Sequence, residues 1–272
     1  MSTLIACFRL LRLALHLLYG AFWAALYPHL PDVLQRHILQ TWSANLLRIL
    51  HIQLDASVCA ALRSGQHGLI VANHVSWLDV FLLNAVLPLR FVAKSEVRSW
   101  PFIGWLCVRS GTFFVARSRR QDVVRVNQQL CSLLKKGAHV ALFPEGTTTN
   151  GAQVKHFHAS LFQAAIDADV PVYPVTLCYQ DREGQFTAIT AYIDDMTFMQ
   201  SLWKICAYST IHARLICADA VPVGSLNRRE LAMSAHAKIA TTLQTNLLPT
   251  EHFFDVPHPT QSFYSLLLNP KA

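Results

Sequence analysis

A short apolar segment that ends in a histidine constrains the fold of this chain more than any other feature. Residues Leu69–Ala72 are all apolar, Asn73 and His74 follow directly, and Asp79 lies five positions after His74. An apolar run of this length, bounded by polar residues, is typical of a buried strand. Residues five apart on a regular helix point about 140° away from each other. His74 and Asp79 can therefore meet only if His74 lies in the turn after the strand and Asp79 lies in the helix that follows.

A histidine with a carboxylate on one of its ring nitrogens is a candidate general base. Neutral imidazole can accept a proton near pH 7. A carboxylate on the other ring nitrogen fixes the tautomer and stabilises the imidazolium that forms. The alternative is structural, with His74 as a hydrogen-bonded core histidine and Asp79 as a charge on the helix surface. The segments that accompany the pair favour the catalytic interpretation.

Three further segments follow at characteristic separations, namely Gly111–Arg117, Phe143–Thr147 and Val170–Val175. In this order, and together with the His74 segment, they resemble the lysophospholipid acyltransferase family, which includes bacterial 1-acylglycerol-3-phosphate acyltransferases. The resemblance extends over about residues 69–175. It implies an enzyme that moves a fatty acyl group from a thioester to the free hydroxyl of a lysolipid, with His74 as the general base and Asp79 as its partner.

The resemblance also implies the substrates and the residues that bind them. Arg117 occupies the position of the family's phosphate-binding arginine, and the block Glu145, Gly146 and Thr147 that of acceptor binding, although Glu145 could instead order Arg117 through an ion pair. Lys94 begins a segment similar to the family's Lys-x-Glu sequence. The donor is expected to be acyl carrier protein or coenzyme A carrying the acyl chain, and no metal or other cofactor is expected.

Two positions depart from the glycerophosphate-specific pattern. Thr148 stands where many such relatives have arginine, and Ala116 precedes Arg117 where aspartate is common. The sequence from Phe143 to Gly151 is similar to branches of the family that include lyso-ornithine lipid acyltransferases. Lysophosphatidic acid is the expected acceptor, lyso-ornithine lipid is the alternative, and a lipid-binding protein without turnover is a third interpretation.

The N-terminal segment is apolar enough to contact a membrane. Between Leu4 and Tyr27 its polar exceptions include Arg9, Arg12 and His16, at positions i, i+3 and i+7 of one helical stripe. Such a helix can span a bilayer or lie in its interface, and internal arginines favour the interface. A cleaved signal peptide is disfavoured because the arginines interrupt its apolar core. A second helix from Asp32 to about Leu50 would complete a helical hairpin.

Composition is consistent with membrane contact and an anionic partner. The chain is 53% hydrophobic and only 14% charged, and its 23 Lys and Arg against 16 Asp and Glu give a net charge of +7. Phospholipid head groups fit this charge. Nucleic acid is not expected, because the basic residues are scattered and no aromatic-basic motif occurs. The scattered cysteines predict free thiols in a reducing compartment. We therefore expect the protein at the inner membrane, with its active site on the cytoplasmic face.

The alternation of strand-like and helix-like segments predicts an α/β fold with a mixed sheet flanked by helices, preceded by the N-terminal apolar helical hairpin. The expected regions are a membrane-associating hairpin over residues 1–54, an acyltransferase domain over 55–250 and a tail over 251–272. Within the domain, Gln185–Tyr192 is predicted to be a strand, and Ser76–Ala85 is predicted to be the helix that carries Asp79.

Overall fold

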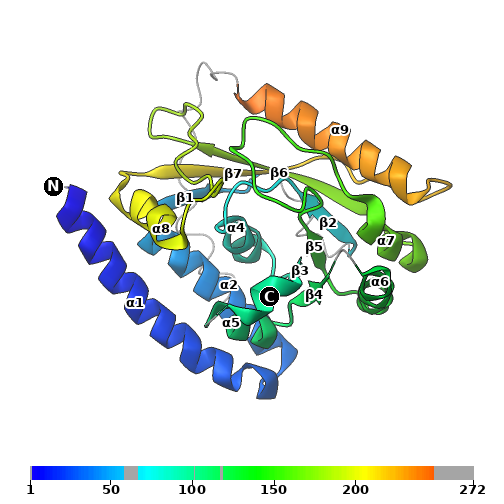
Figure 1. Ribbon diagram of the computed structural model, residues 1–272, viewed down its shortest axis with the longest axis horizontal. Helices are drawn as coiled ribbons and strands as arrows, with labels where there is room; N and C mark the ends of the chain where they lie inside the picture. The colour runs from blue at the N-terminus through cyan, green and yellow to red at the C-terminus, as the bar shows by residue number, and fades with distance from the viewer. Residues whose placement is uncertain (1, 58–66, 101, 117–118, 248–272) are drawn as a thin grey trace, which may run out of the picture.

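The structure is a computed structural model, and it describes residues 2–57, 67–100, 102–116 and 119–247 (Figure 1). The described chain folds around a seven-stranded sheet with the strand order β1-β7-β6-β2-β5-β3-β4. The strands are β1 Ile52–Asp55, β2 Leu69–Ala72, β3 Arg90–Lys94, β4 Phe113–Val115, β5 Val140–Leu142, β6 Val172–Gln180 and β7 Ile211–Cys217.

Helices cover both faces of this sheet. The α-helices are α1 Ser2–Leu26, α2 Asp32–Ile49, α4 Asp79–Val86, α5 Ile103–Arg109, α6 Arg120–Lys135, α7 Gln163–Ala168, α8 Phe198–Ala207 and α9 Arg228–Leu247. Short 3-10 helices lie at η1 Tyr27–His29, η2 Ser95–Ser99 and η3 Ala159–Phe162. In Figure 1, α1, α2, α4 and α8 lie on one side of the sheet, whereas α7 and α9 lie on the other. The predicted mixed sheet flanked by helices is thus confirmed.

The centre of the sheet is parallel and fully buried. All residues of β2 are inaccessible to solvent, and β2 pairs in parallel with β5 on one side and with β6 on the other. The sheet is mixed because β6 and β7 are antiparallel. Carboxyl ends of parallel strands meet at one edge of a sheet, and ligands bind there in open α/β sheets. Residues 73 and 143, which follow β2 and β5, are therefore brought to the same edge.

The N-terminal hairpin is held together by close contacts between α1 and α2. The ring of His16 stacks on the indole of Trp42 with centroids 4.7 Å apart. Each of the two side chains also hydrogen-bonds the backbone carbonyl of the other residue, at 3.0 and 3.2 Å. Gly20 permits this approach, because a Cβ at that position would overlap the Trp42 side chain. Thus His16, one member of the predicted polar stripe, faces the protein.

Two predictions about local structure are wrong. Residues Gln185–Tyr192 do not form a strand: Phe186 makes an isolated bridge to Gln180, and the rest is loop. The helix expected from Ser76 begins instead at Asp79, because the carboxylate of Asp79 binds the N–H groups of the preceding residues and holds them in a turn.

The cysteines also differ in part from the expectation. Cys7, Cys107, Cys131, Cys178 and Cys206 are free, but Cys217 is disulfide-bonded. The prediction of free thiols is therefore wrong for Cys217, and the cysteines give no argument for a reducing compartment. Residues 251–272 of the expected tail lie outside the described part of the chain, and the division into three regions stays a prediction.

Candidate active site

His74 and Asp79 form the hydrogen-bonded pair that their spacing predicts. His74 lies in the turn between β2 and α4, and Asp79 is the first residue of α4. The Nδ1 atom of His74 lies 2.7 Å from Oδ2 of Asp79. The side chain of Asp79 is inaccessible to solvent, whereas that of His74 is 20% exposed. Because Asp79 occupies Nδ1, the Nε2 nitrogen is the one left to accept a proton from a substrate.

The Asp79 carboxylate is held by three further donors. The backbone N–H groups of Val75 and Ser76 donate to Oδ2 at 2.7 and 2.9 Å. The hydroxyl of Tyr179, which lies on β6, donates to Oδ1 at 2.5 Å. A buried carboxylate that accepts several hydrogen bonds is stabilised in its charged form. The pair thus has a fixed anion behind the histidine, and sequence reasoning missed the contribution of Tyr179.

Asn73 ties the start of this turn to the central strands. Its side-chain oxygen accepts the backbone N–H of Leu177 at 2.8 Å, and its side-chain nitrogen donates to the carbonyl of the same residue at 3.0 Å. Asn73 is completely buried. The chain can therefore leave the sheet at residue 73 while the neighbouring part of β6 keeps its hydrogen-bond partners.

Glu145 fixes the backbone of His74 from the other side. One carboxylate oxygen accepts the backbone N–H of His74 and the other accepts that of Lys155, both at 2.7 Å. Burial raises the pKa of Glu145, and the hydrogen bonds from Lys155 and His74 oppose this rise. Glu145 is only 3% exposed. Both oxygens thus contact backbone rather than the cavity, so acceptor binding by Glu145 itself stays a prediction.

The turn after Glu145 leads the chain back across His74. Gly146 has φ +71°, which favours glycine, and its N–H donates to the carbonyl of Phe143. The backbone N–H of Thr149 then donates to the His74 carbonyl at 2.8 Å. Gly146 and Thr147 both line the large cavity described below. The hydroxyl of Thr148 donates to the backbone carbonyl of Tyr192.

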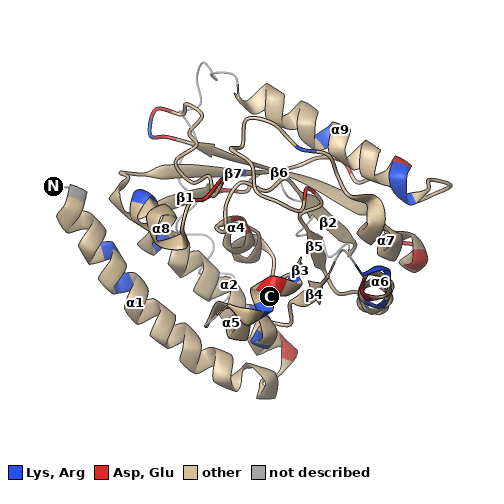
Figure 2. Ribbon diagram, in the orientation of Figure 1, with Lys and Arg blue, Asp and Glu red and all other residues tan. Residues whose placement is uncertain are grey.

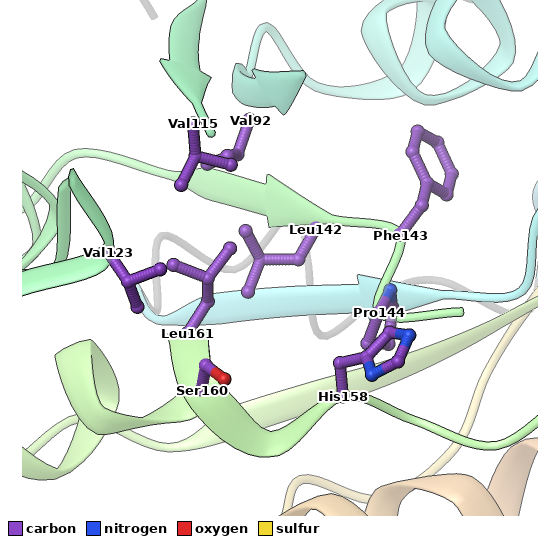
Figure 3. A pocket seen from close by; sticks show the side chains of 9 residues that line it. All are labelled: Val92, Val115, Val123, Leu142, Phe143, Pro144, His158, Ser160 and Leu161. Atoms are coloured by element: carbon purple, nitrogen blue, oxygen red, sulfur yellow. The ribbon is translucent and has the colours of Figure 1, made fainter. Parts of the chain in front are cut away.

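Phe143 supports the imidazole. The two rings are stacked, with centroids 4.0 Å apart and planes 12° apart. Phe143 also lines a second, smaller cavity of about 270 Å³, which lies between β3, β4, β5 and η3 (Figure 3). There the Phe143 side chain points away from the aliphatic side chains of Leu142 and Leu161. Phe143 thus separates this small cavity from the histidine.

A much larger cavity, of about 1870 Å³, lies in front of His74. It reaches from the turn that carries His74 to the N-terminal hairpin. The walls toward the hairpin are mainly apolar and include Leu13, Leu17, Trp23, Trp42, Leu46, Trp77 and Phe81. A cavity of this shape and polarity suits a long hydrocarbon chain whose reactive end lies at the histidine.

Charged side chains of both signs line this cavity. Among the described residues that line it, Lys94, Arg109 and Lys155 are basic, and Glu96, Asp194 and Asp195 are acidic. Lys94 is exposed. Arg117 lies outside the described residues, so its predicted role is not addressed. Sequence reasoning did not assign Arg109 or Lys155, because neither lies at a position that the family resemblance marks.

The described residues contain no group of three His, Cys, Asp or Glu side chains close enough to hold a metal ion. In the same part of the chain, one helical segment, Thr3–His29, is long and apolar enough to cross a membrane, with a mean hydropathy of 1.5.

Comparisons with known proteins show the family and the fold. A family model described as Acyltransferase matches residues 57–178. A lyso-ornithine lipid O-acyltransferase of Pseudomonas aeruginosa is 36% identical over 85% of this chain and 89% of its own. A 1-acyl-sn-glycerol-3-phosphate acyltransferase of Neisseria meningitidis is 42% identical over 62% of this chain and 71% of its own. The crystal structure of a 1-acyl-sn-glycerophosphate acyltransferase from Thermotoga maritima has the same fold, with a TM-score of 0.68 at 18% identity over 92% of this chain and 98% of that one. The chain therefore belongs to the lysophospholipid acyltransferase family and is an acyltransferase.

Proposed function

We propose that this enzyme transfers a fatty acyl group from acyl carrier protein or coenzyme A to the free hydroxyl of 1-acyl-sn-glycerol-3-phosphate, in phospholipid biosynthesis. The observation that carries the proposal is the position of His74. Its Nδ1 is held by a buried carboxylate, and its side chain lines a cavity large and apolar enough for an acyl chain.

The reaction follows from this arrangement. The acceptor hydroxyl gives its proton to Nε2 of His74 while its oxygen attacks the thioester carbonyl carbon. The new C–O bond forms, the C–S bond breaks, and the imidazolium returns the proton to the leaving thiolate. Asp79 stabilises the imidazolium between these steps. No covalent acyl-enzyme is needed, because the acceptor itself is the nucleophile.

The side chains that line the cavity include apolar ones, which suit a fatty acyl chain, and charged ones, which suit a polar head group. The apolar walls formed by α1, α2 and α4 suit the fatty acyl chain. Lys94, Arg109 and Lys155, which also line the cavity, offer cations for a phosphate group, which supports lysophosphatidic acid as the acceptor although Thr148 stands at a position where many relatives have arginine. We include Arg117, Gly146 and Thr147 in the acceptor site on the family pattern.

Lyso-ornithine lipid is the second candidate acceptor. The Pseudomonas aeruginosa relative that matches 85% of this chain has that name. The carboxylates of Glu96, Asp194 and Asp195 at the same cavity would suit an amino group. A lipid-binding protein without turnover is disfavoured, because a buried carboxylate behind a histidine has no use in binding alone.

We further propose that α1 lies in the membrane interface rather than across the bilayer. Its outward stripe consists of Leu4, Phe8, Leu11, Leu15, Leu18 and Phe22, each at least 60% exposed. On its inward face, the guanidinium of Arg9 donates to the carbonyls of Cys206, Tyr208 and Ser209, next to the end of α8. Figure 2 shows α1 as uncharged over most of its length.

A helix fixed to the protein along one face cannot be surrounded by lipid, whereas an interfacial helix needs only one apolar face. On α8, which packs against α1, Trp203 and Met199 are also exposed apolar residues. The outward stripe of α1 would place the mouth of the site at the inner membrane, on the cytoplasmic face.

A thiol-release assay on the purified protein tests the reaction. Acyl-coenzyme A and acyl carrier protein thioesters are each offered with lysophosphatidic acid or lyso-ornithine lipid, and His74→Ala is compared with His37→Ala, a histidine exposed on α2. We expect release that requires lysophosphatidic acid, and a loss of about 10²- to 10⁴-fold in His74→Ala only. Release with lyso-ornithine lipid alone would replace the acceptor, and normal turnover in His74→Ala would refute the mechanism.

A further inference from the structure

Tyr179 contacts the catalytic pair from a distant part of the chain. It lies on β6, 100 residues after Asp79 in the sequence, and its hydroxyl donates to Asp79 Oδ1 at 2.5 Å. Both residues are buried, Asp79 at 0% and Tyr179 at 2% exposure. Water therefore does not compete for this hydrogen bond, and hydrogen bonds to charged groups in such surroundings are the strong ones.

The two oxygens of Asp79 have different partners. Oδ2 contacts the imidazole of His74 and two backbone N–H groups, whereas Oδ1 accepts a hydrogen bond from the Tyr179 hydroxyl. Tyr179 is thus the side chain that opposes His74 across the carboxylate. It can fix the rotation of Asp79, and it can withdraw negative charge from the oxygen that meets the imidazole.

The phenol remains a donor under all ordinary conditions. Burial raises the pKa of Tyr179 well above its usual 10, and the charge of Asp79 raises it further. At neutral pH the hydroxyl is therefore protonated, and its proton points at the carboxylate.

We propose that Tyr179 is a positioning residue of this acyltransferase, which orients Asp79 and limits the negative charge on Oδ2, so that the imidazolium of His74 is held in place but can still return its proton to the leaving thiolate. The role is distinct from packing, because it depends on the hydroxyl and not on the ring. It rests on the proposed function of His74 as the general base.

The proposal predicts a defined change in Tyr179→Phe, which keeps the ring in the core. Without the phenol, the rotation of Asp79 is less fixed, so the imidazole is oriented less well, and Oδ2 carries more negative charge, so the imidazolium gives up its proton to the leaving thiolate less readily. Glu145 is the other carboxylate that contacts His74, since it accepts the backbone N–H of that residue. This contact is unchanged in Tyr179→Phe. We expect kcat to fall about 10-fold with little change in KM, and the acid limb of the pH–rate profile to move to higher pH.

Tyr173→Phe is the matched control. Tyr173 is buried on the same strand and in the same core cluster, six residues and thus about 20 Å from Tyr179. It should keep the wild-type pH–rate profile. A folded Tyr179→Phe enzyme with wild-type kcat and an unmoved acid limb would overturn the proposal.

A second measurement separates this proposal from the proposed function. In protein with ¹⁵N-labelled histidine, the Nδ1–H resonance of His74 is identified by its loss in His74→Ala. We expect Tyr179→Phe to move it downfield, because the hydrogen bond to Asp79 strengthens. An unmoved resonance refutes the role of Tyr179 whether or not the enzyme turns over, whereas a moved resonance with normal turnover in His74→Ala refutes only His74 as the base.

Discussion

The imidazole of His74 lies face to face with the phenyl ring of Phe143, with ring centroids 4.0 Å apart. Phe143 in turn stacks on Phe91 at 5.9 Å. The histidine is therefore held in its plane by an aromatic ring and along its edge by Asp79, which together orient Nε2.

Loss of this stack should lower turnover modestly. An aromatic pair contributes about 0.5–1.5 kcal/mol beyond its buried area, so we expect Phe143→Leu to reduce kcat about 2- to 10-fold in the thiol-release assay. Phe91→Leu removes the second ring of the stack without touching His74 and should have the smaller effect on kcat. Equal effects of the two substitutions would show that the contact with the imidazole has no special role.

The charge of Asp79, and not only its shape, should be required. Asp79→Asn can keep an oxygen toward His74 and its amide toward Tyr179, whose hydroxyl can accept as well as donate. The imidazolium then lacks its counter-charge, and we expect kcat to fall about 10²- to 10⁴-fold with a folded protein by circular dichroism. Turnover within about 3-fold of wild type would show that His74 needs no anion behind it.

Replacement of Glu145 by glutamine should reduce stability. The amide nitrogen of Glu145→Gln would face the backbone N–H of either His74 or Lys155, and leaving one buried donor unsatisfied costs about 1–3 kcal/mol. Chemical denaturation measures this loss. Glu96→Gln is the control, since Glu96 is exposed at the same cavity. A selective rise in the KM for the acceptor, without loss of stability, would instead support acceptor binding by Glu145.

Charges placed on the outward stripe of α1 should release the protein from membranes. Leu11 and Leu18 are 60% and 69% exposed, and burying a leucine is worth about 1.5–3 kcal/mol. The double variant Leu11→Glu, Leu18→Glu should bind vesicles of phosphatidylethanolamine and phosphatidylglycerol about 100-fold more weakly in flotation. Met233→Glu on α9, at 69% exposure, is the matched control and should bind as wild type. Equal binding by the double variant would contradict an interfacial α1.

The free energy of unfolding should decrease at alkaline pH, partly because the thiol of Cys178 is buried. Burial raises the pKa of Cys178 from 9.0 to about 11. Between these values the unfolded chain releases a proton that the folded chain retains, so the contribution of Cys178 is full below pH 9 and declines toward pH 11. Denaturation of wild type from pH 8.5 to 11 should thus show a steeper loss than Cys178→Ala, by at most about 1.4 kcal/mol per pH unit. Identical slopes would refute the shift.

The hydrogen-bonded pair of His74 and Asp79 could be predicted from sequence because its geometry is local. A strand, a turn and the first residue of a helix place His74 and Asp79 together, and the spacing of five residues allows no other regular arrangement. The predicted position of His74 in the turn is confirmed. The resemblance to a family of acyltransferases, carried by four short segments, is confirmed as well.

The supporting contacts could not be predicted because they join distant segments. Tyr179 and Phe143 are aromatic residues near the ends of strands, where an apolar pattern predicts only burial. Their contact with the pair depends on which strands are neighbours, since β2 lies between β5 and β6. The loop over Gln185–Tyr192 was wrongly predicted as a strand for a related reason. Its apolar residues Ile189 and Ala191 pack in or against the core without pairing to a strand.

The two hydrogen bonds between Asn73 and Leu177 make the asparagine side chain a substitute for a peptide unit. Its primary amide places an N–H donor beside a carbonyl acceptor, as a backbone strand partner does. Aspartate lacks the donor, leucine lacks both groups, and glutamine is longer by a methylene. Position 73 therefore favours asparagine over these three residues, because its amide joins the start of the His74 turn to β6 through both hydrogen bonds.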